Sequence, residues 1–75
     1  MNKERRNKIS RTIKEMETIK KYLKDILSEE EYAFDSMPEN LQCSMRGEES
    51  EEAISCMDEA VDLLDEVIEK LEEIQ

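Results

Sequence analysis

Apolar residues between positions 53 and 74 repeat in two interleaved heptad series. The first series is Ile54, Met57, Val61, Leu64, Ile68 and Leu71, and the second is Ala53, Cys56, Ala60, Leu63, Val67 and Ile74. A stripe that repeats every three and four residues forms one seam of a helical bundle. A second stripe, displaced by one position, widens the apolar face beyond what one neighbouring helix covers. We therefore predict a helix that packs against two neighbours.

The first part of the chain carries a similar pattern over residues 3–35. Its apolar side chains at helical spacing are Ile9, Ile13, Met16, Ile19, Leu23, Ile26, Leu27 and Phe34, with Tyr22 and Ala33 extending a second edge. This spacing predicts a second long helix. Pro38 cannot continue a helical hydrogen-bond ladder and disfavours the helical region for the residue before it, so the helix is expected to end near residues 34–36.

The segment between the two patterns predicts a short connector. Ser36 and Glu39 have the spacing of a capping box, which predicts a helical turn over about residues 37–43 with Leu41 as its inward anchor. Gly47 is expected to interrupt the helical structure before the last helix begins. Acidic residues from Glu48 onward suit the positive end of a helix dipole, so that helix is expected to span about residues 48–75. The expected fold is an all-α antiparallel helical hairpin, a single domain over residues 1–75.

Length indicates that the hairpin associates with copies of itself. The chain has 75 residues, one Gly and one Pro, which argues against a sheet-rich fold and leaves a single core marginal without oligomerisation. We expect a four-helix bundle or coiled-coil-like oligomer, with a homodimer favoured and a tetramer and either subunit direction left open. The expected interface residues are Ile54, Met57, Ala60, Val61, Leu63, Leu64, Val67, Ile68 and Leu71.

Polar residues and cysteines on these stripes have ordinary structural interpretations. Lys20 and Glu30 interrupt the main seam of the first helix, where such residues set the register or reach water with their charged ends. The beginning of the chain is polar and basic and does not resemble a secretory signal. We therefore expect a cytoplasmic protein with reduced cysteines. Cys56 is expected to be buried as a small hydrophobe, and Cys43 to be exposed in the connector.

Charge is unevenly distributed between the two helices. Residues 1–27 hold nine bases and four acids, a net of +5, whereas residues 28–75 hold two bases and seventeen acids, a net of −15, which together give −10. The basic first helix can lie beside the acidic second one, within a hairpin or across a dimer. The remaining carboxylates are either a solubilising face or an imitation of a nucleic-acid backbone that binds a basic protein surface. The possible partner-binding residues are Met45, Arg46, Glu59, Asp62, Glu66 and Glu69.

Several function classes have no support in this sequence. The chain contains no histidine, so a cysteine–histidine nucleophile and the Glu-x-x-His pairs of di-iron bundles are excluded. No calcium-loop pattern surrounds Gly47, and we expect no enzymatic activity, no metal and no cofactor. The net charge of −10 disfavours direct binding to nucleic acid or to a membrane surface. Apolar residues occur only in short runs, such as Ile26-Leu27 and Leu63-Leu64, which excludes a membrane-spanning helix.

The connector and the start of the second helix carry a recognisable series of residues. These are the run Ala33-Phe34-Asp35-Ser36-Met37-Pro38-Glu39-Asn40-Leu41-Gln42, then Ser44, Arg46-Gly47-Glu48 and the acidic stretch that ends in Ala53-Ile54. This series resembles a family of small, acidic, two-helix proteins carried by phages and prophages of Gram-positive bacteria. Met45 departs from the family, in which an acidic residue is more common. The resemblance covers the connector and the second helix, and the first helix only in character. It implies a phage context and a helical hairpin, and it supplies no catalytic residues.

Two functions follow as expectations from the charge and the resemblance. The first is a non-enzymatic inhibitor that occludes a host defence protein or another nucleic-acid-acting protein. The second is a structural or regulatory adaptor in phage assembly, replication or transcription, with a solvent-facing acidic surface. The connector itself is either a structural corner or a docking tip that presents Met45 and Arg46.

Overall fold

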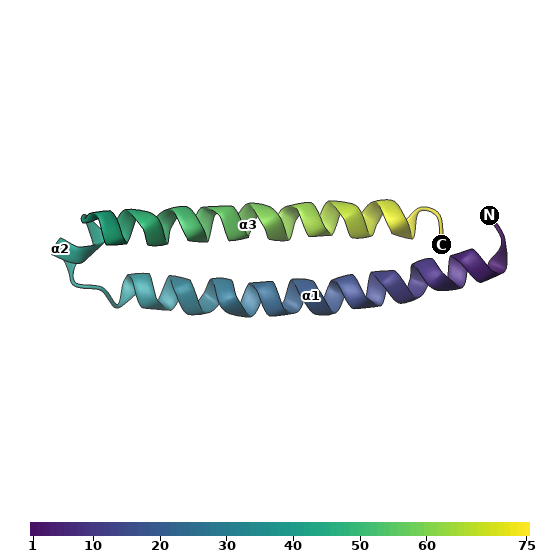
Figure 1. Ribbon diagram of the computed structural model, residues 1–75, viewed down its shortest axis with the longest axis horizontal. Helices are drawn as coiled ribbons and strands as arrows, with labels where there is room; N and C mark the ends of the chain where they lie inside the picture. Colours follow the sequence, from purple (N-terminus) through teal and green to yellow (C-terminus); the bar gives the residue numbers. More distant parts are fainter.

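The computed structural model describes all residues, 1–75, as an extended helical hairpin. The helices are α1 (Lys3–Asp35), α2 (Glu39–Gln42) and α3 (Met45–Glu72). The two long helices lie side by side and run in opposite directions, and the short α2 forms the connector at one end (Figure 1). The molecule measures 58 × 15 × 12 Å, so it is one helix pair wide and one layer thick. The predicted helical hairpin is confirmed.

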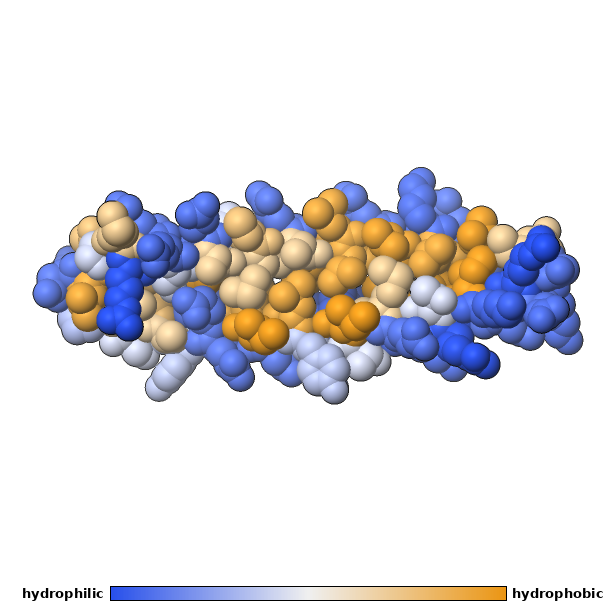
Figure 2. Space-filling model, viewed as in Figure 1, coloured by the Kyte–Doolittle hydropathy of each residue, from blue (hydrophilic) through white to orange (hydrophobic).

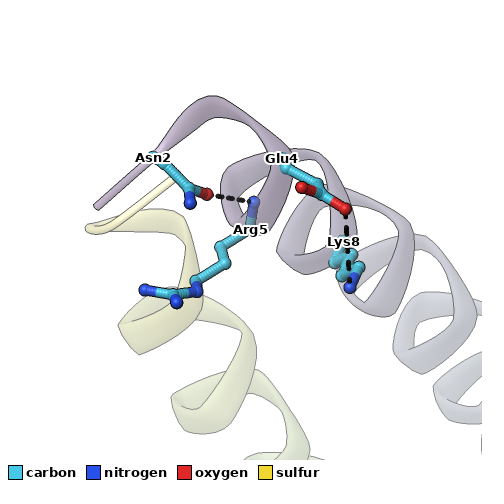
Figure 3. Close-up of polar contacts among 4 residues, drawn as sticks. All are labelled: Asn2, Glu4, Arg5 and Lys8. Carbon is cyan, nitrogen blue, oxygen red and sulfur yellow. Dashed lines mark hydrogen bonds and ion pairs between the residues drawn. The ribbon is translucent and has the colours of Figure 1, made fainter.

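The start of α1 is stabilised by a cap and by local charges. The Asn2 side-chain oxygen accepts a hydrogen bond from the Arg5 backbone N–H at 2.8 Å, which satisfies one of the free donors of the first turn. Glu4 and Lys8 approach to 4.0 Å one turn apart (Figure 3). At the other end, the helix stops at Asp35, as the position of Pro38 predicts.

The N-terminal turns of α1 extend beyond the end of α3 (Figure 1). The Ser10 hydroxyl donates to the Gln75 side-chain oxygen at 3.1 Å, so the residues before Ser10 project past the last residues of the chain. This projecting segment carries Lys3, Arg5, Arg6 and Lys8 against the single acid Glu4. It is therefore the most basic part of an otherwise acidic molecule.

The connector differs in detail from the sequence-based expectation. The short helix α2 forms, but Pro38 precedes it and no side chain caps its first turn, so the expected Ser36–Glu39 capping box is wrong. Leu41 is 39% exposed and is not an inward anchor. Instead, the Gln42 side-chain amide donates to the Phe34 carbonyl at 2.9 Å. The connector is therefore tied back onto the end of α1 by a polar side chain.

The last helix begins earlier than expected, at Met45 and not near residue 48. Ser44 is the residue that caps it, because its hydroxyl accepts the Gly47 backbone N–H at 3.5 Å. Gly47 is buried inside the first turn of α3 and does not break the chain. A Cβ atom at this position would lie 2.1 Å from the Gln42 carbonyl oxygen. Glycine is needed here because the connector backbone passes directly against the helix.

Candidate functional site

The seam between α1 and α3 is the core of the single chain. Its buried hydrophobic residues are Ile13 and Leu27 from α1 and Val61 and Ile68 from α3. They belong to the first heptad series of α3 and to the matching stripe of α1, and half-buried aliphatic side chains continue the seam in both directions. No large side chain is completely buried, so the core of the single chain is small.

Two polar contacts cross the seam and fix its register. The Lys20 ammonium lies 2.6 Å from an Asp65 carboxylate oxygen, and the Ser50 hydroxyl donates to a Glu30 carboxylate oxygen at 2.7 Å. The hydrogen bond to Lys20 lowers the pKa of Asp65 below its ordinary value of 3.8. The same bond raises the pKa of Lys20 above 10.5. Both polar residues that interrupt the stripe of α1 are therefore satisfied by α3.

A band of apolar side chains outside the seam stays uncovered, and we call it the apolar strip. It consists of Ile19, Tyr22 and Ile26 from α1 and of Cys56, Leu63 and Val67 from α3. All six are exposed, Leu63 to 60% and Val67 to 42%. Exposed apolar side chains that gather on one surface are typical of an interaction surface.

The two halves of the apolar strip lie on the same broad side of the hairpin. On each helix, the strip includes positions that directly precede a seam residue, such as Ile26 before Leu27 and Val67 before Ile68. In an antiparallel helix pair, positions displaced from the seam in this common direction face the same side. Figure 2 shows the result, with apolar atoms spread over both helices along the middle of this side.

The structure divides the predicted interface residues into two groups. Ile54, Met57, Val61, Leu64, Ile68 and Leu71 are buried or half-buried in the seam of one chain, whereas Leu63 and Val67 are exposed and Ala60 is half-buried beside them. Cys56 is also exposed, so the expectation of a buried Cys56 is wrong for the single chain. The reason is that this cysteine belongs to the second heptad series, which α1 does not reach.

An acidic groove occupies the opposite broad side, close to the connector. Its apolar lining comes from Leu27, Phe34 and Ile54, and its volume is about 400 Å³. Four carboxylates surround that apolar floor, and they belong to Glu31, Asp35, Glu51 and Asp58. The groove can therefore receive an aliphatic chain that ends in a positive charge, such as that of Lys or Arg.

Negative charge is concentrated at the connector end of the molecule. The Lys20–Asp65 and Glu30–Ser50 contacts set Asp25 roughly level with Met57, so residues 25–57 form the connector half. This half holds ten acids against Arg46 alone, a net of −9, and the rest holds eleven acids and ten bases, a net of −1. The open half is nearly neutral because the basic start of α1 lies beside the acidic end of α3.

The predicted partner-binding residues do not form one cluster. Glu59, Asp62, Glu66 and Glu69 are exposed along the middle and later turns of α3, whereas Met45 and Arg46 are exposed in its first turn. Thirteen residues separate Arg46 from Glu59, which is about 20 Å along a helix. A small partner surface therefore cannot contact both Arg46 and the carboxylates from Glu59 onward.

Sequence reasoning missed the acidic groove and the part that α1 plays in the apolar strip. The groove carboxylates occupy positions that directly follow seam residues. This placement identifies a groove only once the register between the two helices is known, because the four carboxylates come from both helices. The signal for the strip was present in Ile19, Tyr22 and Ile26, which repeat at helical spacing one position before the seam. It could have been found by projecting both helices together.

Other kinds of site and the comparisons with known proteins add no further assignment. No group of three Cys, Asp or Glu side chains has the arrangement that a metal ion requires. Neither long helix includes an apolar stretch that could cross a membrane. A scan against protein-family models, a search of curated proteins and a search of solved structures found no match.

Proposed function

We propose that this protein acts by protein–protein binding and carries out no chemistry of its own. In this proposal it works in the host cytoplasm as a homodimeric four-helix bundle and inhibits a host protein that has a basic surface. A defence protein or another nucleic-acid-acting enzyme is the natural target, because its substrate channel must attract phosphate. The phage-like connector sequence supplies the biological context for this choice.

The main support is the concentration of negative charge at the connector end. A net charge of −9 over residues 25–57 creates a field that attracts a basic surface and accelerates its association. A separate row of exposed carboxylates, Glu59, Asp62, Glu66 and Glu69, lies farther along α3 in the other half of the molecule. Inhibition would follow from occlusion, since a helix pair seated in a basic channel excludes the nucleic acid.

The proposal is tested by capture from host extract and by inhibition of the captured enzyme over a range of salt concentrations. The expected result is capture of a basic nucleic-acid enzyme, its inhibition, and release as salt rises, because screening weakens attraction between exposed charges. Simultaneous substitution of Asp62, Glu66 and Glu69 by Lys should abolish inhibition and leave the helical content unchanged. Inhibition that survives this charge reversal would contradict acidic mimicry.

A matched control changes charge on the basic segment. Substitution of Lys3 and Lys8 by Glu alters two exposed charges at the open end and leaves the acidic surface intact. Capture should persist in this variant. Loss of capture in both variants would show that the partner recognises the fold, and not the carboxylates of α3, because the two variants change the net charge in opposite directions.

An adaptor function is the second proposal, favoured by exposed apolar side chains at the connector end. Tyr32 and Met45 are each 76% exposed, and Leu41 lies between them in the chain. Replacement of Met45 and Arg46 by Ala should then weaken capture of a phage protein in a salt-insensitive way, with no loss of thermal stability. A structural corner would lose stability instead.

A further inference from the structure

We propose that a second copy of this chain covers the apolar strip, broad side against broad side, so that α1 and α3 of each copy both contribute to the interface. This inference rests on the homodimer of the proposed function and specifies its contact surface. Sequence reasoning placed the interface on α3 alone. The structure assigns half of it to Ile19, Tyr22 and Ile26 of α1, and it leaves the acidic groove free on the outer side.

The first argument is the small core of the single chain. Only four hydrophobic residues are buried, and none of them completely, although the two long helices supply many more apolar side chains. A chain of this length is marginally stable even with a good core. A second layer of helices would convert the exposed Leu63 and Val67 into core residues.

The second argument is the size and position of the apolar strip. The whole broad side that carries the strip measures 58 × 15 Å, so it is large enough to supply the roughly 800 Å² that each partner contributes to a standard protein interface. The strip lies near the middle of this side, since Tyr22 is in the middle of α1 and Leu63 in the later half of α3. A two-fold axis through its centre would place the strip of one copy directly on the strip of the other.

The third argument is the chemistry along the border of the apolar strip. The strip contains no charged residue, whereas charged residues follow on the same helix faces beyond its ends. These are Glu15 and Glu29 on α1 and Glu49 and Lys70 on α3, all of them exposed. An apolar centre with a charged rim is the usual organisation of an interface between folded proteins.

The two cysteines provide a built-in test, because both are free and exposed in the single chain. Cys56 lies in the apolar strip, and Cys43 lies in the connector outside it. The experiment labels the full chain with a maleimide for a short time over a dilution series and quantifies the modification of each cysteine by peptide mass spectrometry. Cys43 serves as the internal control for reagent access.

The expected result is concentration-dependent protection of Cys56 alone. At high protein concentration Cys56 should react at least about tenfold more slowly than on full dilution, because interface cores exclude solvent and reagents, while Cys43 reacts equally fast throughout. Modification of Cys56 as fast as that of Cys43 at every concentration would overturn the inference. The wild-type dilution series decides this without any variant.

A pair of variants then locates the interface. Leu63→Lys places a charge in the apolar strip and should remove the protection of Cys56. Asp62→Lys introduces the same lysine side chain at the neighbouring position, which lies outside the strip, and should preserve the protection of Cys56. Protection that survives Leu63→Lys would overturn the assigned surface. These readouts concern self-association only, so a failure of the proposed inhibitory function would leave them unaffected.

Discussion

Lys20 and Asp65 form the one ion pair that joins α1 to α3, with 2.6 Å between the ammonium nitrogen and a carboxylate oxygen. The two residues are 45 positions apart in the chain, so the contact sets how far one helix slides along the other. Exposure of the two side chains is limited, at 25% and 45%. The pair is the shortest of the three ion pairs in the molecule, since Glu4–Lys8 and Lys70–Glu73 each approach only to 4.0 Å.

Loss of the Asp65 charge should reduce stability in a pH-dependent way. Its pKa is lowered in the folded protein by the hydrogen bond to Lys20, so the pair stabilises the fold above the ordinary carboxyl pKa and loses this effect as pH falls through the folded value. Asp65→Asn should lower the Tm at pH 7, and the difference from wild type should vanish at strongly acidic pH. Thermal melts followed by circular dichroism measure both.

Lys20 sets the upper end of the pH range over which the ion pair stabilises the fold. The pKa of Lys20 is raised above 10.5, so the contribution of the pair is complete below that value and is lost as pH rises through the folded value. Asp62→Asn is the control, because Asp62 is exposed on the same helix and makes no ion pair. A destabilisation by Asp65→Asn that stays constant from neutral to strongly acidic pH would contradict the assigned cause.

Ser50→Ala should destabilise the connector half of the hairpin. The Ser50 side chain is almost completely buried and donates to Glu30 at 2.7 Å. Its removal leaves a half-buried carboxylate without a partner, which costs about 1–3 kcal/mol. Urea unfolding measures the change. Ser55→Ala removes an exposed hydroxyl and should alter stability by less than about 0.5 kcal/mol; an equal effect of both variants would contradict the role of the Glu30 contact.

Gly47→Ala should be destabilising although alanine is the better helix former. Helix propensity alone favours alanine by about 1 kcal/mol. However, the new methyl group would lie 2.1 Å from the Gln42 backbone oxygen, and forced overpacking typically costs about 1–3 kcal/mol. A lower urea midpoint is expected, with Glu48→Ala as the exposed control in the same turn. A stabilised Gly47→Ala variant would show that the connector does not pack against α3 in this way.

Ile68→Ala should be among the most damaging single substitutions. Ile68 is 5% exposed in the seam, and truncation of a buried isoleucine to alanine costs about 2–5 kcal/mol. Ile74 is 45% exposed beyond the end of α3, so Ile74→Ala should cost clearly less. Equal losses from the two variants in urea unfolding would contradict the assigned seam.

The sequence predicted the long helices well because their signals are local. Heptad spacing located the α1 and α3 stripes, and Pro38 marked the end of α1 at Asp35. The start of α3 was missed by three residues because Gly47 resembles a helix breaker when neighbouring segments are unknown. Only the fold reveals that the glycine makes room for the Gln42 carbonyl.

The candidate surfaces could be predicted only in part, because they depend on how the two helices are paired. The uncovered second series of α3 was evident from its width, and the exposure of Leu63 and Val67 agrees with that reasoning. The acidic groove combines residues such as Asp35 and Glu51 from different helices. Their proximity follows from the antiparallel register, which Lys20–Asp65 and Glu30–Ser50 define and which no local pattern contains.

Sedimentation equilibrium across a dilution series measures whether the apolar strip of one hairpin is covered by another. The single chain has a mass of 8.9 kDa. Wild-type protein should sediment at twice this mass at micromolar and higher concentrations, and Leu63→Lys should sediment as a folded single chain under the same conditions. A wild-type protein that stays well folded at 8.9 kDa at every concentration would show that no second copy covers the apolar strip.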